Sequence, residues 1–148
     1  MSLPTLLLVE DNEDDVFLMK RALKAAGIEN PLQIAEDGQA AIDYLSGAGT
    51  HADREKSPLP TIVFLDLKLP FKSGHEVLEW IRQQPRFTNL VVIVLTSSNE
   101  KIDLDRAYKL GANSFVVKPP TATKLQELAD SFKQWWLNHN QVAPVKVD

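Results

Sequence analysis

The hydrophobic positions along the chain follow two alternating patterns. Short runs of consecutive apolar residues, typical of strands buried in a parallel sheet, alternate with stretches in which apolar residues recur every three or four positions, as in helices. This alternation predicts an α/β domain with five parallel strands covered by helices. The predicted strands are Leu6–Val9, Leu32–Ala35, Thr61–Leu65, Leu90–Leu95 and Ser114–Val117.

A segment with helical periodicity follows each of these strands. Gly27 and Gly111 stand just after the first and fourth segments, where a residue with positive φ commonly ends a helix. Five strand–helix units joined by right-handed crossovers predict a doubly wound (βα)5 sandwich of the flavodoxin-like class, with parallel strand order 2-1-3-4-5. The predicted helices are Asp14–Ala26, Gly38–Leu45, Gly74–Gln84, Asn99–Leu110 and Thr121–Asn138.

Two further segments stand out from this pattern. Ser46–Pro60 is polar and contains Gly, Pro and charged residues, so it is expected to be a long exposed loop. The last predicted helix carries an apolar face that continues to Phe132, Trp135 and Trp136. Two tryptophans at its end are more apolar surface than a monomer normally exposes. They either fold back on the domain or contact a partner, which makes these three residues candidates for a homodimer interface.

Composition narrows the class of protein. A chain of 148 residues with 44% hydrophobic and 24% charged residues predicts one domain over 1–148, with a core of about residues 5–138, a tail at 139–148 and no fused output domain. The net charge of −4 argues against direct binding of nucleic acid. The longest apolar run, Leu90–Leu95, is too short to span a membrane, so a cytoplasmic protein is expected. Because cysteine is absent, oxygen and nitrogen ligands must carry any chemistry.

Polar side chains stand at the ends of four predicted strands. Glu10 and Asp11 follow the first strand, Asp66 the third, Thr96 the fourth and Lys118 the fifth. Because the carboxyl ends of parallel strands meet at one edge of a sheet, where ligands of such folds bind, we expect these five side chains to converge.

Such a group of residues predicts a particular chemistry. Three converging carboxylates repel one another unless a positive charge lies between them. Magnesium prefers oxygen ligands and is typically held by one or two carboxylates plus a phosphate. A carboxylate in this setting can attack a phosphoryl donor and form an acyl phosphate. Lys118 would neutralise the phosphoryl oxygens, and Thr96 would donate a hydrogen bond to one of them.

Four motifs at these strand ends resemble, in their order, the receiver domain of bacterial two-component response regulators. They are Leu8-Val9-Glu10-Asp11, Phe64–Pro70 followed by Gly74, Val94–Ser97 and Val116–Pro119. The resemblance extends from about Thr5 to Asn138.

This resemblance implies the site residues. Asp66 is the phosphoacceptor. Glu10, Asp11 and Asp66, with the main-chain carbonyl of Lys68, hold Mg²⁺, and Thr96 and Lys118 bind the phosphoryl group. The resemblance also implies a cis peptide between Lys118 and Pro119. Phe115 would be the switch aromatic, whose rotation is coupled to movement of Thr96.

The resemblance further implies the partners and the activity. A sensor histidine kinase donates the phosphoryl group, and an unknown downstream protein reads it. The chain has no enzyme activity beyond Mg²⁺-dependent self-phosphorylation and autodephosphorylation. The long loop and the pair Trp135-Trp136 are most similar to the cyanobacterial phytochrome-associated branch of single-domain regulators, which suggests a phytochrome-type kinase. A homodimer is expected through the face formed by the fourth helix, fifth strand and fifth helix.

Three other functions fit the sequence less well. A phosphohydrolase that forms an aspartyl phosphate needs a second Asp two residues after the nucleophile, where this chain has Lys68. A dinucleotide-binding module needs a Gly-rich turn after the first strand, where this chain has Glu10-Asp11-Asn12. A pseudo-receiver without phosphorylation ranks third, since all five active positions are filled.

The remaining acidic residues and the histidines are not expected to belong to the functional site. Glu13, Asp14 and Asp15 are expected to be favourable charges at a helix amino terminus rather than site residues. His51, His75 and His139 lack partners at metal-ligand spacing, so all three are expected at the surface.

Overall fold

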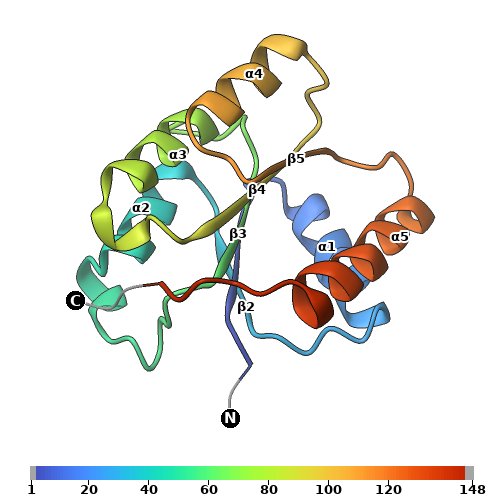
Figure 1. Cartoon of the computed structure of the whole chain (residues 1–148), viewed down its shortest axis with the longest axis horizontal. Helices are drawn as coiled ribbons and strands as arrows, with labels where there is room; N and C mark the ends of the chain where they lie inside the picture. The colour runs from blue at the N-terminus through green and yellow to red at the C-terminus, as the bar shows by residue number, and fades with distance from the viewer. Residues whose placement is uncertain (1–2, 146–148) are drawn as a thin grey trace.

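The computed structural model describes residues 3–145 and contains one five-stranded parallel sheet (Figure 1). The strand order is β2-β1-β3-β4-β5, which confirms the predicted doubly wound order. The strands are β1 (Leu6–Val9), β2 (Leu32–Ala35), β3 (Ile62–Leu65), β4 (Val91–Thr96) and β5 (Ser114–Val117).

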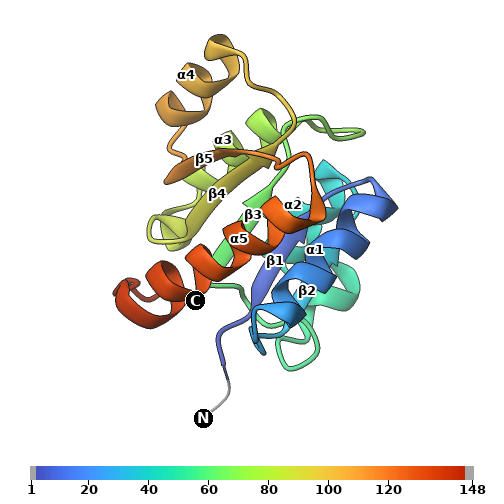
Figure 2. The ribbon, with the colours of Figure 1, turned by 90° about the vertical axis from the view of Figure 1, so that its right-hand side faces the viewer.

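The helices form a layer on each face of the sheet. Figures 1 and 2 show α1 and α5 on one side and α2, α3 and α4 on the other. Each layer encloses its own apolar core, and successive residues of β1 alternate between the two. The helices are α1 (Glu13–Ala25), α2 (Gly38–Ser46), α3 (Gly74–Gln83), α4 (Lys101–Lys109) and α5 (Ala122–Phe132). Among the described residues no helix is long and apolar enough to cross a membrane.

The strand register brings the predicted site residues to one edge. Val9 of β1 pairs with Leu65 of β3, so the residues that follow them, Glu10 and Asp66, leave the sheet side by side. The main-chain N–H of Asp66 donates to the carbonyl of Val9 over 3.1 Å, which extends the ladder to Asp66. The order and register therefore create the convergence that the sequence predicted.

Four of the five helices begin with a side-chain cap. The cap residues of α1, α2, α3 and α5 are Asn12, Asp37, Ser73 and Thr121, and each side chain accepts a hydrogen bond from an N–H three residues later. In α4 the cap residue, Glu100, makes no such bond. The start of α4 is therefore held by other contacts.

The end of the last predicted helix differs from the prediction. The α-helix stops at Phe132, and a π-helical segment, η3 (Lys133–His139), follows it. Phe132 is buried, with its ring edge-on to Phe64 at a centroid distance of 4.9 Å, so its assignment to an interface was wrong. Trp136 packs against the core, whereas the side chain of Trp135 is 63% exposed.

Part of the predicted tail also packs against the domain. Figure 1 shows the chain after η3 crossing the lower edge of the sheet toward α2. Val142 and Val145 pack against the two apolar cores, and the side-chain amide of Asn89 donates to the carbonyl of Pro144 over 3.2 Å. Residues 146–148 of that predicted tail lie outside the described residues.

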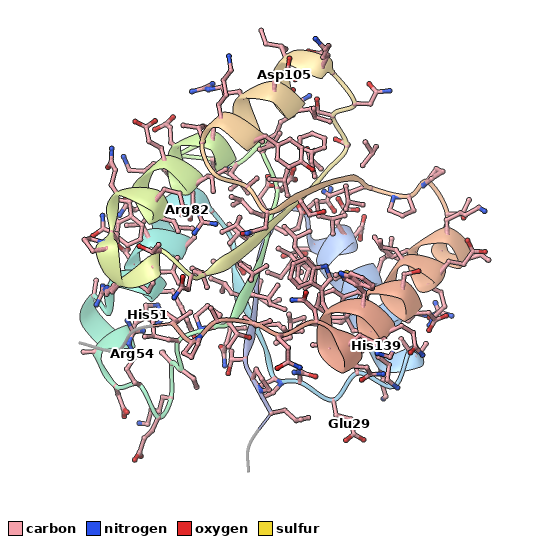
Figure 3. The ribbon with its side chains drawn as sticks, in the orientation of Figure 1. Glu29, His51, Arg54, Arg82, Asp105 and His139 are labelled. Atoms are coloured by element: carbon pink, nitrogen blue, oxygen red, sulfur yellow. The ribbon has the colours of Figure 1, made fainter. Side chains whose placement is uncertain are left out.

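The polar segment before β3 is anchored more firmly than its composition suggested. It contains a 3-10 turn, η1 (Gly49–Ala52), and a second turn, η2 (Pro85–Phe87), precedes β4. The guanidinium of Arg54 donates to the carbonyls of Tyr44 and Leu45 at the end of α2, each over 2.8 Å, and to that of Ser57 over 3.2 Å. Figure 3 shows Arg54 and His51 beside the end of α2. The segment is a folded loop rather than a loosely exposed one.

The three histidines differ in environment. His139 is exposed, as predicted. His51 is half-buried, with its ring 4.9 Å from that of Tyr44. His75 is only 5% exposed, and its surface assignment was wrong. It lies in the first turn of α3, where it contacts α4.

Candidate functional site

Asp66 lies at the end of β3 with its carboxylate held by the chain itself. Its side chain is nearly buried, and the main-chain N–H of Leu67 donates to Oδ1 over 2.7 Å. The residue that opens α3 keeps this turn tight, because a Cβ on Gly74 would lie 2.1 Å from the carbonyl oxygen of Asp66. The carboxylate is therefore fixed in orientation before any ligand arrives.

Two other carboxylates meet Asp66 as predicted. Carboxylate oxygens of Glu10, Asp11 and Asp66 all lie within 4.8 Å of one another. Glu10 is 3% exposed, and its burial raises its pKa from 4.5 to about 6 although the hydrogen bond from Lys118 opposes that rise. Three oxygen donors this close, two of them buried, suit a hard divalent cation. The chemistry of the donor set thus fits a divalent metal ion.

Lys118 supplies the positive charge within the protein. Its Nζ donates to Asp15 Oδ2 over 2.9 Å and to Asp66 Oδ2 over 3.1 Å, and it makes a short hydrogen bond with Glu10 Oε1. Burial alone would lower the pKa of Lys118, but the hydrogen bonds to Glu10 and Asp15 and the charge of Asp66 raise it well above its ordinary value. Lys118 therefore stays protonated at the acidic edge.

Asp15 is a site residue that the sequence interpretation missed. It was assigned to a favourable helix-terminal charge, yet it is one of the three carboxylates bound to Lys118. A signal was present in the spacing, because Asp15 stands four residues before Met19 and so continues the buried stripe of α1 formed by Met19, Ala22 and Leu23. Glu13 and Asp14 remain exposed in the first turn, as expected.

Thr96 and Phe115 occupy the positions expected of them. Thr96 ends β4 and is fully buried, and its Oγ1 accepts a hydrogen bond from the main-chain N–H of Ser98 over 3.3 Å. Phe115 lies in β5 and packs half-buried beside Val94 and Ala107. Its main-chain N–H donates to Tyr108 Oη over 3.1 Å, so α4 contacts the edge strand at this residue.

Of two expectations about neighbouring main-chain groups, one is wrong and the other stays a prediction. All peptide bonds between described residues are trans, so the expected cis bond between Lys118 and Pro119 was wrong. Trans is the form that an X–Pro bond prefers by about 0.5–1 kcal/mol. Lys68 is exposed in the loop after β3, and the metal-binding role of its main-chain carbonyl stays a prediction.

Comparison with known proteins identifies relatives over most of the chain. Residues 6–130 match the family of response regulator receiver domains. The protein named probable methanogenesis regulatory protein FilR2, from Methanothrix harundinacea, is 39% identical over 136 residues, covering 92% of this chain and 85% of the relative. Response regulator Rcp1 from Synechocystis is 36% identical over 132 residues, covering 89% and 88%.

Solved structures give the same result. The Mn²⁺-bound form of Rcp1 superposes with a TM-score of 0.86 at 34% identity, covering 96% of this chain and 100% of the other. The phosphorylated cyanobacterial phytochrome response regulator RcpA superposes with a TM-score of 0.89 at 29% identity, covering 97% and 100%. One relative thus binds a divalent metal and another carries a phosphoryl group, on the fold described above.

Proposed function

Because this chain belongs to the response regulator receiver domain family, as its motifs predicted, we propose that Asp66 carries the phosphoryl group in two-component signalling. Receiver domains accept a phosphoryl group from histidine kinases and act as phosphoacceptor switches. The observation that carries the residue assignment is the setting of Asp66. It is a nearly buried carboxylate, oriented by the Leu67 N–H and placed beside both an acidic pair and the ammonium of Lys118.

The chemistry assigned to this chain is a single phosphoryl transfer. A carboxylate oxygen of Asp66 attacks the phosphorus of a phosphohistidine, the new O–P bond forms as the N–P bond breaks, and the imidazole leaves with the electron pair. Lys118 pairs with the charge on the transferred oxygens, and the Thr96 hydroxyl donates a hydrogen bond to one of them. Phe115 then reports the movement of Thr96 through packing, since it has no hydroxyl.

Glu10, Asp11, Asp66 and the main-chain carbonyl of Lys68 are the proposed Mg²⁺ ligands. When bound, the ion neutralises the negative charge that the carboxylates and the phosphoryl oxygens bring together. The same site supports self-phosphorylation from a small donor and slow hydrolysis of the acyl phosphate. Turnover of foreign phosphate esters is not expected, because Lys68 stands where an acid–base Asp would be required.

The core assignment is tested by weighing the intact protein after incubation with acetyl phosphate and Mg²⁺. The wild type should gain one phosphoryl group, and Asp66→Asn should gain none. Asp43→Asn, a change of the same kind on α2 at a carboxylate outside the acidic group, is the matched control and should be labelled at the wild-type rate. Labelling of Asp66→Asn would place the acceptor on another residue.

The proposed donor is a phytochrome-type histidine kinase. The likeness to RcpA and Rcp1 supports the predicted membership of the phytochrome-associated branch, and the donor class follows from it. An unknown downstream protein would read the phosphorylated form. Phosphoryl transfer from autophosphorylated phytochrome kinases should be at least about tenfold faster than transfer from kinases with unrelated sensors, a preference worth about 1.4 kcal/mol. Equal rates of transfer from both kinase classes would contradict the proposal of a phytochrome-type donor.

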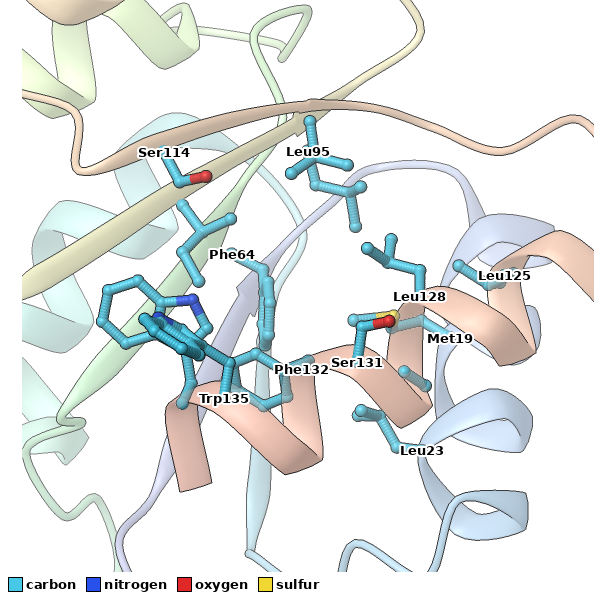
Figure 4. A pocket seen from close by; sticks show the side chains of 14 residues that line it. Met19, Leu23, Phe64, Leu95, Ser114, Leu125, Leu128, Ser131, Phe132 and Trp135 are labelled. Carbon is cyan, nitrogen blue, oxygen red and sulfur yellow. The ribbon is translucent and has the colours of Figure 1, made fainter. Parts of the chain in front are cut away.

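A homodimer through α4, β5 and the region after α5 is the proposed assembly. Large apolar side chains on this face are exposed: Ile102, Leu104, Tyr108, Val117 and Trp135. Figure 4 shows Trp135 at the border of an apolar cavity between α5 and the sheet, which Leu125, Leu128 and Phe132 also line. The volume of this cavity is about 190 Å³. A second copy that covers this face would bury the indole of Trp135.

Sedimentation of single variants tests the dimer. Trp135→Ala should shift the population toward the monomer, because that ring is 63% exposed. Phe17→Ala removes an aromatic ring of similar exposure, 62%, from α1 and should leave the mass unchanged. Trp136 is left intact, since it packs against the core. An unchanged mass for Trp135→Ala would contradict the proposed interface.

A further inference from the structure

Helix α4 is held less by apolar packing than the other helices are. Its only buried residue is Ala107, whereas each of the other four α-helices buries at least two. Its cap residue also makes no side-chain hydrogen bond. The position of its first turn must therefore depend on other polar contacts, and these lead to the phosphoacceptor site.

Asp103, in the first turn of α4, is the centre of those contacts. Ser98 Oγ donates to Asp103 Oδ2 over 2.5 Å and accepts from the main-chain N–H of Glu100 over 3.4 Å. On the other side, His75 Nε2 lies 3.3 Å from the main-chain carbonyl of Asp103. Because a carbonyl only accepts, Nε2 must carry the proton in this contact. Asp103 thus joins the turn after β4 to α4, and α4 to the buried ring on α3.

Ser98 connects Asp103 to Thr96, because its side chain binds the first and its main chain binds the second. The main-chain N–H of Ser98 donates to Thr96 Oγ1, which occupies one lone pair of the hydroxyl. Thr96 is fully buried, and its Oγ1 is already bonded as an acceptor. Because a hydroxyl can donate its proton while it accepts, a phosphoryl oxygen on Asp66 would be a suitable acceptor for that proton.

We propose that Asp103 is a positioning residue for phosphoryl transfer to Asp66. Through Ser98 it holds the hydroxyl of Thr96 so that the lone pair faces the Ser98 N–H and the proton is left for the phosphoryl group. This inference rests on the roles given above to Asp66 and Thr96. It adds a residue of α4 to the reaction, although that residue touches neither the phosphoryl group nor the metal ligands.

The alternative is that Ser98 and Asp103 only stabilise the start of α4. Ser98 does take the place of a cap by accepting the Glu100 N–H, so removing either side chain lowers the stability of the helix under both explanations. The explanations differ in whether the reaction rate responds, and in whether that response depends on Thr96.

Rates of phosphoryl uptake from acetyl phosphate, at saturating Mg²⁺ and measured by intact mass, separate the two. Loss of one positioning hydrogen bond should slow Asp103→Ala and Ser98→Ala by about fivefold each. Asp103→Asn keeps an oxygen that accepts from Ser98 and should recover most of the rate. Asp105→Ala is the matched control on the same helix. It breaks only the 3.5 Å ion pair with Lys101 and should react at the wild-type rate.

The deciding measurement is made in a Thr96→Ala background. If Asp103 acts through the Thr96 hydroxyl, Asp103→Ala should cause no further slowing there. An equal slowing in both backgrounds, or a wild-type rate for Asp103→Ala and Ser98→Ala, would overturn the proposal. Failure of the proposed function looks different, because Asp66→Asn would then still be labelled. If Asp103→Ala does not fold, Ser98→Ala breaks the same contact from the other side and decides the question.

Discussion

Lys118 and Asp66, at the ends of the edge strand β5 and the central strand β3, form an ion pair of 3.1 Å at the carboxyl edge of the sheet. The side chains are only 18% and 8% exposed. The ammonium of Lys118 balances negative charge from several carboxylates of the site, because it also binds Glu10 and Asp15. Any metal ion or phosphoryl group that arrives must share these carboxylates with Lys118.

Replacement of Lys118 should therefore destabilise the metal-free protein. Lys118→Met leaves nearly buried carboxylates without their cation, and loss of one partner from such a pair costs about 3 kcal/mol in the free energy of unfolding. Mg²⁺ at millimolar concentration should restore part of the loss, since it offers the same carboxylates a positive charge. Urea unfolding with and without Mg²⁺ measures both effects.

Lys101→Met is the control for that experiment. Lys101 pairs with Asp105 on the surface of α4, where the two side chains are 88% and 47% exposed. Its replacement should change stability by no more than about 0.5 kcal/mol, with or without Mg²⁺. A Lys118 variant that unfolds like the Lys101 variant would mean that the acidic edge does not depend on this charge.

Gly74→Ala should disturb Asp66, the proposed phosphoacceptor, directly. The added methyl group would lie 2.1 Å from the carbonyl oxygen of Asp66, so the turn after β3 or the start of α3 must move, at a cost of roughly 1–3 kcal/mol. The rate of labelling by acetyl phosphate should fall with the stability. Gly49→Ala is the comparison, because its methyl group meets nothing within 4 Å and only the positive φ of 56° is strained. That variant should be labelled at the wild-type rate, and a normal rate for Gly74→Ala would refute the argument.

Replacement of Phe71 by glycine should stabilise the protein, in contrast to Gly74→Ala. It is the only described residue other than glycine with positive φ, at 66°, and its side chain is 86% exposed. A left-handed conformation costs an L-residue roughly 1–2 kcal/mol, and little apolar burial is lost on truncation. Phe71→Gly should therefore raise the unfolding free energy by about 1 kcal/mol. Lys72→Gly, next to it without positive φ, should not stabilise the protein, so equal effects of the two changes would contradict the strain explanation.

The sequence predicted the fold and the convergence of the acids for one physical reason. Strands buried on both faces give consecutive apolar runs, and the order of strands and helices places every strand end at the same edge. The positions of Glu10, Asp66 and Thr96 relative to the strands were therefore enough to predict that these residues lie at this edge. Their convergence follows from backbone geometry that the local pattern already specifies.

The contacts that the sequence did not reveal join elements far apart in the chain. Asp15 binds Lys118 across 103 positions, and His75 contacts Asp103 across 28. Which side chain reaches which partner depends on how helices are placed over the sheet, and local periodicity carries no such information. The cis bond expected before Pro119 was carried over from the family and does not occur in this chain.

The folded loop before β3 also depends on side-chain contacts that local periodicity does not reveal. The final carbonyls of a helix lack partners within the helix, and at the end of α2 the guanidinium of Arg54 supplies donors to Tyr44 and Leu45. Composition alone makes this loop look exposed, because a polar residue that binds main chain resembles one that faces water. Removing the guanidinium should therefore release the loop.

Arg54→Ala should lower the free energy of unfolding by about 1–2 kcal/mol, because carbonyls of Tyr44, Leu45 and Ser57 lose a donor. Lys56→Ala, an exposed cation two residues away, should change it by no more than about 0.5 kcal/mol. Hydrogen exchange should speed up within residues 46–60. The labelling rate of Asp66 should stay at the wild-type value, since the loop enters β3 at its amino end and Asp66 follows the carboxyl end. Equal unfolding of the two variants would show that the guanidinium does not anchor the loop.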